Sequence, residues 1–260
     1  MHTTVYNNTH DVTIWSGVQL SAGSKFETFL ADEVASRLHD ETGKAEFTSH
    51  LNSLATTGFA QDSLRAILEA EHPEERDWAV GEALTEAWLS REHGVVWPWN
   101  MERDKRTPKA SLPGADLVGF VTQGDVTRLV LGEVKSSSDA NTPPNVMTGR
   151  SGMTRQLENL VADMGLLYTL IRWLQPRCRA NTAEPHFNAA VGALLESGNK
   201  AMALFGVLVR DTQPDERDLR SRGEHLGKCV KAPTNCYLLA LYLPCSIASL
   251  PDHVQAGGEV

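Results

Sequence analysis

Two short β-rich runs, at residues 117–122 and 127–134, constrain the fold of this chain more than any other feature. Both runs consist largely of valine, leucine, threonine and phenylalanine, which favour extended backbone on a half-buried surface. Only Gln123-Gly124-Asp125 separates them, and a glycine-containing connection of this length is typical of a β-hairpin. The two runs are therefore predicted to pair as neighbouring antiparallel strands.

Three ionisable residues stand at one end of this predicted hairpin. Asp116 directly precedes the first run, and Glu133 and Lys135 stand at the end of the second. Alternate side chains of a strand share a face, so Glu133 and Lys135 point the same way and Val134 points into the opposite layer. If the strands pair, two carboxylates and one ammonium group gather at the end of an otherwise apolar sheet.

Helical patterns precede the hairpin. Apolar residues recur at helical intervals in 62–71 and more strongly in 74–92, and Pro73-Glu74-Glu75 suits the first turn of the second helix. Gly94 is a plausible stop for that helix. The segment Val95–Trp99 is then predicted to be a strand.

Helices and strands alternate after the hairpin as well. Residues 136–151 are rich in serine, asparagine and proline and predict a loop, and 153–174 predicts one long helix. A further helix is expected at 185–195, and strands are expected at 201–209 and 237–243. This order predicts an α/β fold in which helices flank a central mixed β-sheet.

The first part of the chain has a less definite pattern. Val12–Leu20 is a possible strand, Lys25–His39 has near-helical apolar spacing, and Asn7-Asn8 is typical of a turn. We therefore expect residues 1–60 to be an N-terminal extension that packs on a core domain formed by residues 61–260.

Composition excludes several classes of protein. Hydrophobic residues make up 41% of the chain, but no stretch approaches the ~18 consecutive apolar residues of a membrane span. The polar N-terminus does not resemble a secretory signal, and a cytoplasmic location is expected. The four cysteines predict neither a disulfide framework nor a zinc site. The nearest pair, Cys229 and Cys236, is a weak metal hypothesis, and two ordinary buried thiols are the favoured interpretation.

The net charge of −9 counts mildly against a nucleic-acid partner, because lysine and arginine drive phosphate binding. Local surfaces matter more than the total charge, however. Basic residues cluster in three stretches, Arg103–Lys109, Arg150–Arg155 and Arg217–Lys231. Nucleic acid therefore remains a possible partner.

The hairpin motif resembles that of the PD-(D/E)XK nuclease superfamily, which has the restriction-endonuclease-like fold. The motif residues are Asp116 at the start of one strand and Glu133 and Lys135 on the next, and the order of elements matches over about residues 74–210. The Pro-Asp dipeptide of the motif is absent here, because two residues separate Pro113 from Asp116. That dipeptide varies widely in the superfamily.

Two further residues fit the resemblance. Glu82 matches an acidic residue often found on the first core helix of the superfamily, and Glu86, one turn later, is the alternative. Gln156 stands near the start of the helix after the motif, where RecB-type members carry a functional glutamine. Those members also carry a tyrosine four residues later, where this chain has Leu160, so the RecB-type assignment is in doubt.

The resemblance implies an αβββαβ core that hydrolyses phosphodiester bonds with Mg²⁺, for which Mn²⁺ can substitute. Asp116, Glu133 and Glu82 would bind the metal, because Mg²⁺ prefers carboxylate oxygens and retained waters. Lys135 would hold or activate the attacking water and contact the phosphate, and Gln156 would orient a water or touch the nucleic-acid backbone.

By analogy with the superfamily, DNA is favoured over RNA as the substrate. An ATPase or helicase partner and a role in prokaryotic antiviral defence or DNA processing are also expectations by analogy.

Other interpretations stay open at this point. The chain could be a catalytically silent nuclease-like module that binds nucleic acid or a partner protein, or an enzyme for another metal-assisted hydrolysis. Glu133 and Lys135 could be a solvated pair at a strand end. Glu82 could be a helix-surface acid, and Gln156 could be an ordinary polar residue near a helix start.

Overall fold

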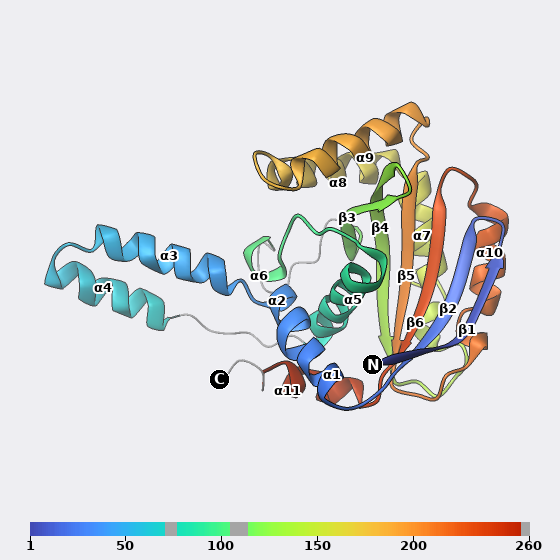
Figure 1. The fold of residues 1–260 in the computed structure, drawn as a ribbon, viewed down its shortest axis with the longest axis horizontal. Helices are drawn as coiled ribbons and strands as arrows, with labels where there is room; N and C mark the ends of the chain where they lie inside the picture. The colour runs from blue at the N-terminus through green and yellow to red at the C-terminus, as the bar shows by residue number, and fades with distance from the viewer. Residues whose placement is uncertain (71–76, 105–113, 256–260) are drawn as a thin grey trace.

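Six strands form one mixed sheet in the computed structural model, which describes residues 1–70, 77–104 and 114–255 (Figure 1). The spatial order is β1-β2-β6-β5-β4-β3. The strands are β1 (His2–His10), β2 (Thr13–Leu20), β3 (Leu117–Gln123), β4 (Val126–Ser137), β5 (Met202–Arg210) and β6 (Asn235–Tyr242). The four central strands are parallel, and β1 and β3 pair antiparallel to them at the two edges.

Helices cover both faces of this sheet. They are α1 (Ser24–Thr28), continued by a π-helical turn and α2 (Ala35–Leu38), then α3 (Glu41–Leu54), α4 (Gly58–Glu69), α5 (Asp77–His93), α6 (Met101–Asp104), α7 (Met153–Ala162), α8 (Met164–Cys178), α9 (Glu184–Glu196), α10 (Arg220–Cys229) and α11 (Leu250–Gln255). Every residue of the central strand β5 is buried between the two helical layers, which is typical of a parallel strand with both faces covered.

Two glycines identify the helices that share a face of the sheet. A methyl group at Gly206 of β5 would lie 2.7 Å from Met153 Sδ and 2.9 Å from Leu157 Cδ1, so α7 packs on this face. On the same face, a methyl group at Gly223 of α10 would lie 2.3 Å from the ring of Trp15 in β2. The strand register aligns both Trp15 and Gly206 with Leu238, so α7 and α10 cover the same side.

The helix α5 packs on the opposite face of the sheet. The ring of His93, at the end of α5, makes an edge contact with Phe205 at a centroid distance of 5.4 Å. Phe205 precedes Gly206 on β5 and therefore points to the other side of the sheet from it. The sheet is thus sandwiched between α5 on one face and α7 with α10 on the other (Figure 1).

The predicted α/β architecture with a mixed sheet flanked by helices is confirmed. The hairpin is also confirmed, with Gln123 opposite Val126 and a tight Gly124-Asp125 connection in which Gly124 has φ 59°. The strands expected at 12–20, 201–209 and 237–243 are also present, as β2, β5 and β6, with ends no more than two residues from those predicted.

The strand predicted at Val95–Trp99 is wrong in extent, because only an isolated bridge joins Val96 to Phe120. Pro98 has no amide hydrogen to continue a ladder. The neighbouring indoles bond instead to backbone carbonyls: Trp97 Nε1 donates to Glu86 and Trp99 Nε1 donates to Val118.

The single helix predicted at 153–174 is divided at Asp163. Its backbone leaves the helical region, with φ −94° and ψ 97°, and its side chain accepts a hydrogen bond from the amide of Leu166. Asp163 therefore caps α8, as short polar side chains do at helix starts. The turn expected at Asn7-Asn8 is also wrong, because both residues lie within β1.

The N-terminal residues contribute directly to the sheet, because β2 hydrogen-bonds to β6 along its length. The helices α3 and α4 form a hairpin that projects from the body of the molecule (Figure 1). The division at residue 60 stays a prediction, and this position falls inside α4. The helix start expected at Pro73-Glu74-Glu75 lies outside the described residues.

No helix within the described part of the chain is both long enough and apolar enough to cross a membrane.

Candidate metal-binding and catalytic site

Asp116 lies where β3 begins and where its pairing with β4 ends. Its backbone amide donates to the carbonyl of Gly132 at 3.0 Å. Its carboxylate Oδ2 accepts a hydrogen bond from the backbone amide of Val134 at 2.9 Å. The side chain therefore replaces the backbone carbonyl that a longer β3 would have offered to β4. This bond holds the Asp116 carboxylate beside the residues that flank Val134.

Glu133 and Lys135 flank Val134 and point to the same face of β4. Lys135 Nζ lies 2.5 Å from Glu133 Oε1. Glu133 is only 4% exposed, whereas Lys135 and Asp116 are partly exposed. Burial raises the pKa of Glu133 to about 7; the negative charge of Asp116 adds to this rise, and Lys135 opposes it. The structure thus brings together the three motif residues that the sequence singled out.

Gln156 lies on α7, the helix that covers the face to which Glu133 and Lys135 point. The strand register places Glu133 beside Gly206, against which the α7 residues Met153 and Leu157 pack. Gln156 is half-buried, and its Oε1 is buried without a hydrogen-bond partner among the described residues. An acceptor in this situation is costly unless another molecule supplies a donor.

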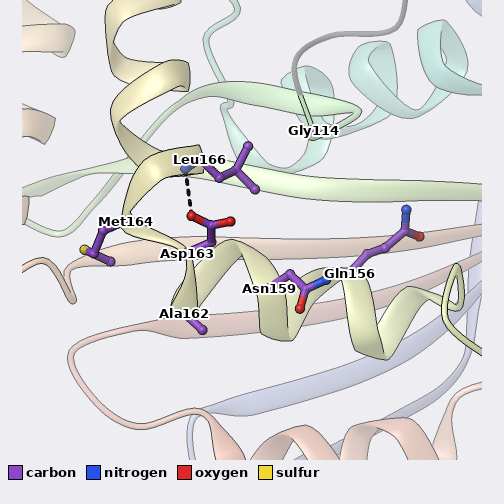
Figure 2. Close-up of a pocket in the computed structure, with 7 residues that line it drawn as sticks. All are labelled: Gly114, Gln156, Asn159, Ala162, Asp163, Met164 and Leu166. Atoms are coloured by element: carbon purple, nitrogen blue, oxygen red, sulfur yellow. Dashed lines mark hydrogen bonds between the residues drawn. The ribbon is translucent and has the colours of Figure 1, made fainter.

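A hollow of about 640 Å³ opens beside this side chain. It extends from Gly114, two residues before Asp116, to the junction of α7 and α8. Figure 2 shows Gln156 and Asn159 projecting from α7, and Asp163 at the start of α8. Its lining residues are Gly114, Gln156, Asn159, Ala162, Asp163, Met164 and Leu166.

Glu82 lies on α5, the helix of the opposite face. Its neighbour Gly81 faces β4 closely, because a methyl group there would lie 2.5 Å from Ser136 Oγ. The half-buried Glu82 is therefore near the end of β4 that carries Lys135.

The alternative helix carboxylate, Glu86, is fully buried, and its Oε2 accepts a 2.6 Å hydrogen bond from Arg37. Arg37 also donates to the carbonyl of Trp99. Glu86 thus has a structural role in joining α5 to α2.

Several basic side chains in the first and third of the stretches found in the sequence pair with acids. Arg217 pairs with Asp215, Arg220 with Glu216, and Lys231 with Asp11. Arg103 pairs with Asp40 and Asp104, and residues 105–109 lie outside the described part.

Cys236 is buried as expected, whereas Cys229 is exposed, which corrects the interpretation of both as buried thiols. Cys229 lies near His225 and Glu158. The spacing of His225 and Cys229, one helical turn apart, was visible in the sequence, but their approach to Glu158 across 67 residues was not.

Comparison with the models of known protein families gave no match, and no curated protein matched the chain.

Proposed function

We propose that this chain is a metal-dependent nuclease of the PD-(D/E)XK type. The observation that carries the proposal is the grouping of Asp116, Glu133 and Lys135 at the end of β4. Asp116 is fixed there by its bond to Val134, and Lys135 bonds to the buried Glu133. The bond to Val134 accounts for the position of Asp116, but it does not account for a buried glutamate and a lysine side by side at the end of β4.

The donor set suits a hard divalent cation. Burial disfavours the ionised form of Glu133, and the nearby negative charge of Asp116 adds to this effect. A cation bound by oxygen ligands would remove this cost. Mg²⁺ takes one or two protein carboxylates and keeps several waters, with Mn²⁺ as a possible substitute. When bound, it would lower the pKa of a coordinated water and neutralise charge on a phosphate.

The other side chains have roles consistent with their positions. Lys135, partly exposed beside Glu133, would hold the attacking water and contact the scissile phosphate as a compact positive charge. Gln156 would supply its buried, unpartnered oxygen to a donor on the substrate or to a water. Glu82 is favoured over Glu86 as the helix carboxylate near the site, because it follows Gly81, which faces Ser136 next to Lys135 on β4.

The order of elements also supports the proposal. From α5 the chain runs through the Val96–Phe120 bridge, β3, β4 and α7 to β5, which follows an αβββαβ core whose first strand is reduced to one bridge. The helices α8 and α9 are additions between α7 and β5. DNA is the preferred substrate in this proposal, and an ATPase or helicase partner in a defence or DNA-processing complex would add basic surface to a chain whose net charge is −9.

The experiment is a cleavage assay with supercoiled plasmid, linear single- and double-stranded DNA, and RNA, in Mg²⁺, Mn²⁺ or EDTA. Wild type is compared with Lys135→Met and with Lys25→Met, which changes an exposed lysine on α1. Cleavage that requires the metal should fall by at least about 100-fold in Lys135→Met and persist in Lys25→Met.

Two results would contradict the proposal of an active enzyme. One is metal-dependent cleavage that Lys135→Met leaves unchanged. The other is tight nucleic-acid binding without cleavage under any condition, which would favour a catalytically silent module. Absence of both binding and cleavage from the chain alone would call for the same assay with the co-purified partner.

A further inference from the structure

The helices α7 and α10 bring three metal-ligating side chains together outside the proposed catalytic site. His225 Nε2 lies 2.7 Å from Glu158 Oε1 and 3.6 Å from Cys229 Sγ. One ligand atom from each residue lies within 4.8 Å of the other two. A carboxylate, an imidazole and a thiol therefore converge from two separate helices.

The packing of α10 determines the direction of two of these side chains. Gly223 and Gly227 face the sheet, where a methyl group would lie 2.3 Å from the Trp15 ring or 2.6 Å from the carbonyl oxygen of His10. His225 and Cys229 lie on another side of the helix and are exposed. They are four residues apart, so they stand one above the other on the helix surface.

Glu158 approaches them from α7. Its neighbour Leu157 is buried against β5, and Glu158 itself is half-buried at the side of the helix. Because α7 and α10 cover the same face of the sheet (Figure 1), Glu158 on α7 can reach His225 on α10. Arg155 also approaches Glu158, at 3.6 Å through its other carboxylate oxygen, which leaves Oε1 to His225.

The combination of ligands selects a class of metal. Thiolate and imidazole favour zinc and neighbouring transition metals, whereas Mg²⁺ favours oxygen ligands. Metal–ligand bonds of about 2.0–2.3 Å place tetrahedral ligand atoms on the order of 3.5 Å apart. The 3.6 Å between His225 and Cys229 matches this value, whereas the 2.7 Å between His225 and Glu158 is a hydrogen-bond distance that has to widen on metal binding. Rotation of the exposed His225 side chain can supply that change.

We propose that Glu158, His225 and Cys229 form a transition-metal site of the zinc type that links α7 to α10, with water as the fourth ligand. Binding would replace the hydrogen bonds of His225 with metal bonds and release the proton of the Cys229 thiol. The metal would link α7, which carries Gln156, to α10, which packs on β2. The inference does not depend on the proposed nuclease activity.

The test is a Co²⁺ titration of the full, tag-free chain followed by absorption spectroscopy. Co²⁺ at this site should give visible bands of tetrahedral character and a near-ultraviolet thiolate-to-cobalt band at one equivalent, and Zn²⁺ should displace it. Cys229→Ser should abolish the thiolate band. His225→Ala should weaken apparent affinity by more than about tenfold, since loss of even an outer hydrogen-bond partner costs that much.

Matched variants separate this site from other sources of binding. Cys245→Ser changes a half-buried cysteine elsewhere and should keep the band. Glu133→Gln should keep it as well, because the proposed catalytic carboxylates contain no sulfur. A thiolate band that survives Cys229→Ser, or no thiolate band in wild type at several equivalents of Co²⁺, would overturn the proposal. Cys229→Ser and His225→Ala replace exposed side chains, so circular dichroism is expected to show an unchanged fold.

Discussion

The carboxylate of Asp116 accepts a hydrogen bond from the backbone amide of Val134, with Oδ2 and N 2.9 Å apart. Val134 lies between Glu133 and Lys135, so this bond ties one motif residue to the backbone of the other two. Asp116 therefore has a structural role in addition to its proposed role as a metal ligand. The two roles can be separated by substitution.

Asp116→Asn should keep the fold and lose the metal. An asparagine oxygen can still accept from Val134, and the free energy of unfolding should change by less than about 1 kcal/mol. Asp116→Ala leaves the amide without that acceptor and should cost about 1–3 kcal/mol. Chemical denaturation measures the change in unfolding free energy of each variant. Mg²⁺ is expected to raise the Tm of the wild type, and this rise should disappear in Asp116→Asn and in Asp116→Ala. A normal Mg²⁺ response in Asp116→Asn would remove this residue from the metal site.

Glu133→Gln should stabilise the metal-free protein at alkaline pH. The pKa of Glu133 is raised to about 7 in the folded chain, chiefly by burial. Its ionised form therefore opposes folding, with a cost that grows as pH rises above the unfolded pKa and is complete above the folded one. Removing the charge should add on the order of 1–3 kcal/mol at pH 8.5 and progressively less as the pH falls to 5.

Unfolding in EDTA at several pH values measures the difference in unfolding free energy between wild type and Glu133→Gln. The same variant should lose the stabilisation by Mg²⁺, so the gain in stability and the loss of metal binding should appear together. A variant that is less stable than wild type at pH 8.5 would show that the pair with Lys135 outweighs the cost of burial.

The strands around the site could be predicted from sequence because their signals are local. The β-rich composition of 127–134 and the connection at Gly124 indicate the hairpin, and the hairpin alone brings Asp116 beside Glu133. The fully apolar run of β5 likewise signals a buried central strand. In these segments local preference and tertiary packing favour the same structure.

Other features depend on distant partners and gave no local signal. The break at Asp163 requires its side chain to cap α8, although the apolar spacing runs through it without interruption. Polar asparagines occupy β1 because β2 provides a pairing edge. The approach of Glu158 to His225 depends on the packing of two helices that are far apart in the chain.

Gln156→Leu should reduce cleavage without reducing stability. The buried Oε1 has no hydrogen-bond partner among the described residues, so its removal relieves a small cost of burial. Stability should be unchanged or slightly higher, whereas kcat/KM should fall by about tenfold or more if the oxygen contacts substrate. Steady-state kinetics and thermal unfolding measure both. Asn159→Leu, an exposed position on the same helix, is the control for added bulk in the hollow.

Arg210→Met should be strongly destabilising, because this residue at the end of β5 is only 2% exposed and holds the segment that follows Lys135. Its guanidinium donates to the carbonyls of Ser137, Asp139 and Asn141. Arg210 Nε also lies 3.4 Å from the Oδ2 of the buried Asp218. Burial raises the pKa of Asp218 above its usual value, and the charge of Arg210 opposes part of this rise.

Arg210→Met leaves the buried carboxylate of Asp218 without its cation and should lower the free energy of unfolding by about 3–5 kcal/mol. The double variant Arg210→Met/Asp218→Asn should recover part of this loss, because the uncompensated charge is gone. Arg217→Met, whose side chain forms a pair with Asp215 at the surface, should cost under about 1 kcal/mol.

Urea denaturation of the wild type, Arg210→Met, Asp218→Asn and the double variant measures the coupling between Arg210 and Asp218. Limited proteolysis should show faster cleavage within residues 137–148 of Arg210→Met, since three carbonyls there lose their donor. If the unfolding free-energy changes of the two single variants add up to that of the double variant, Arg210 stabilises this segment independently of Asp218, with the backbone carbonyls as its main partners.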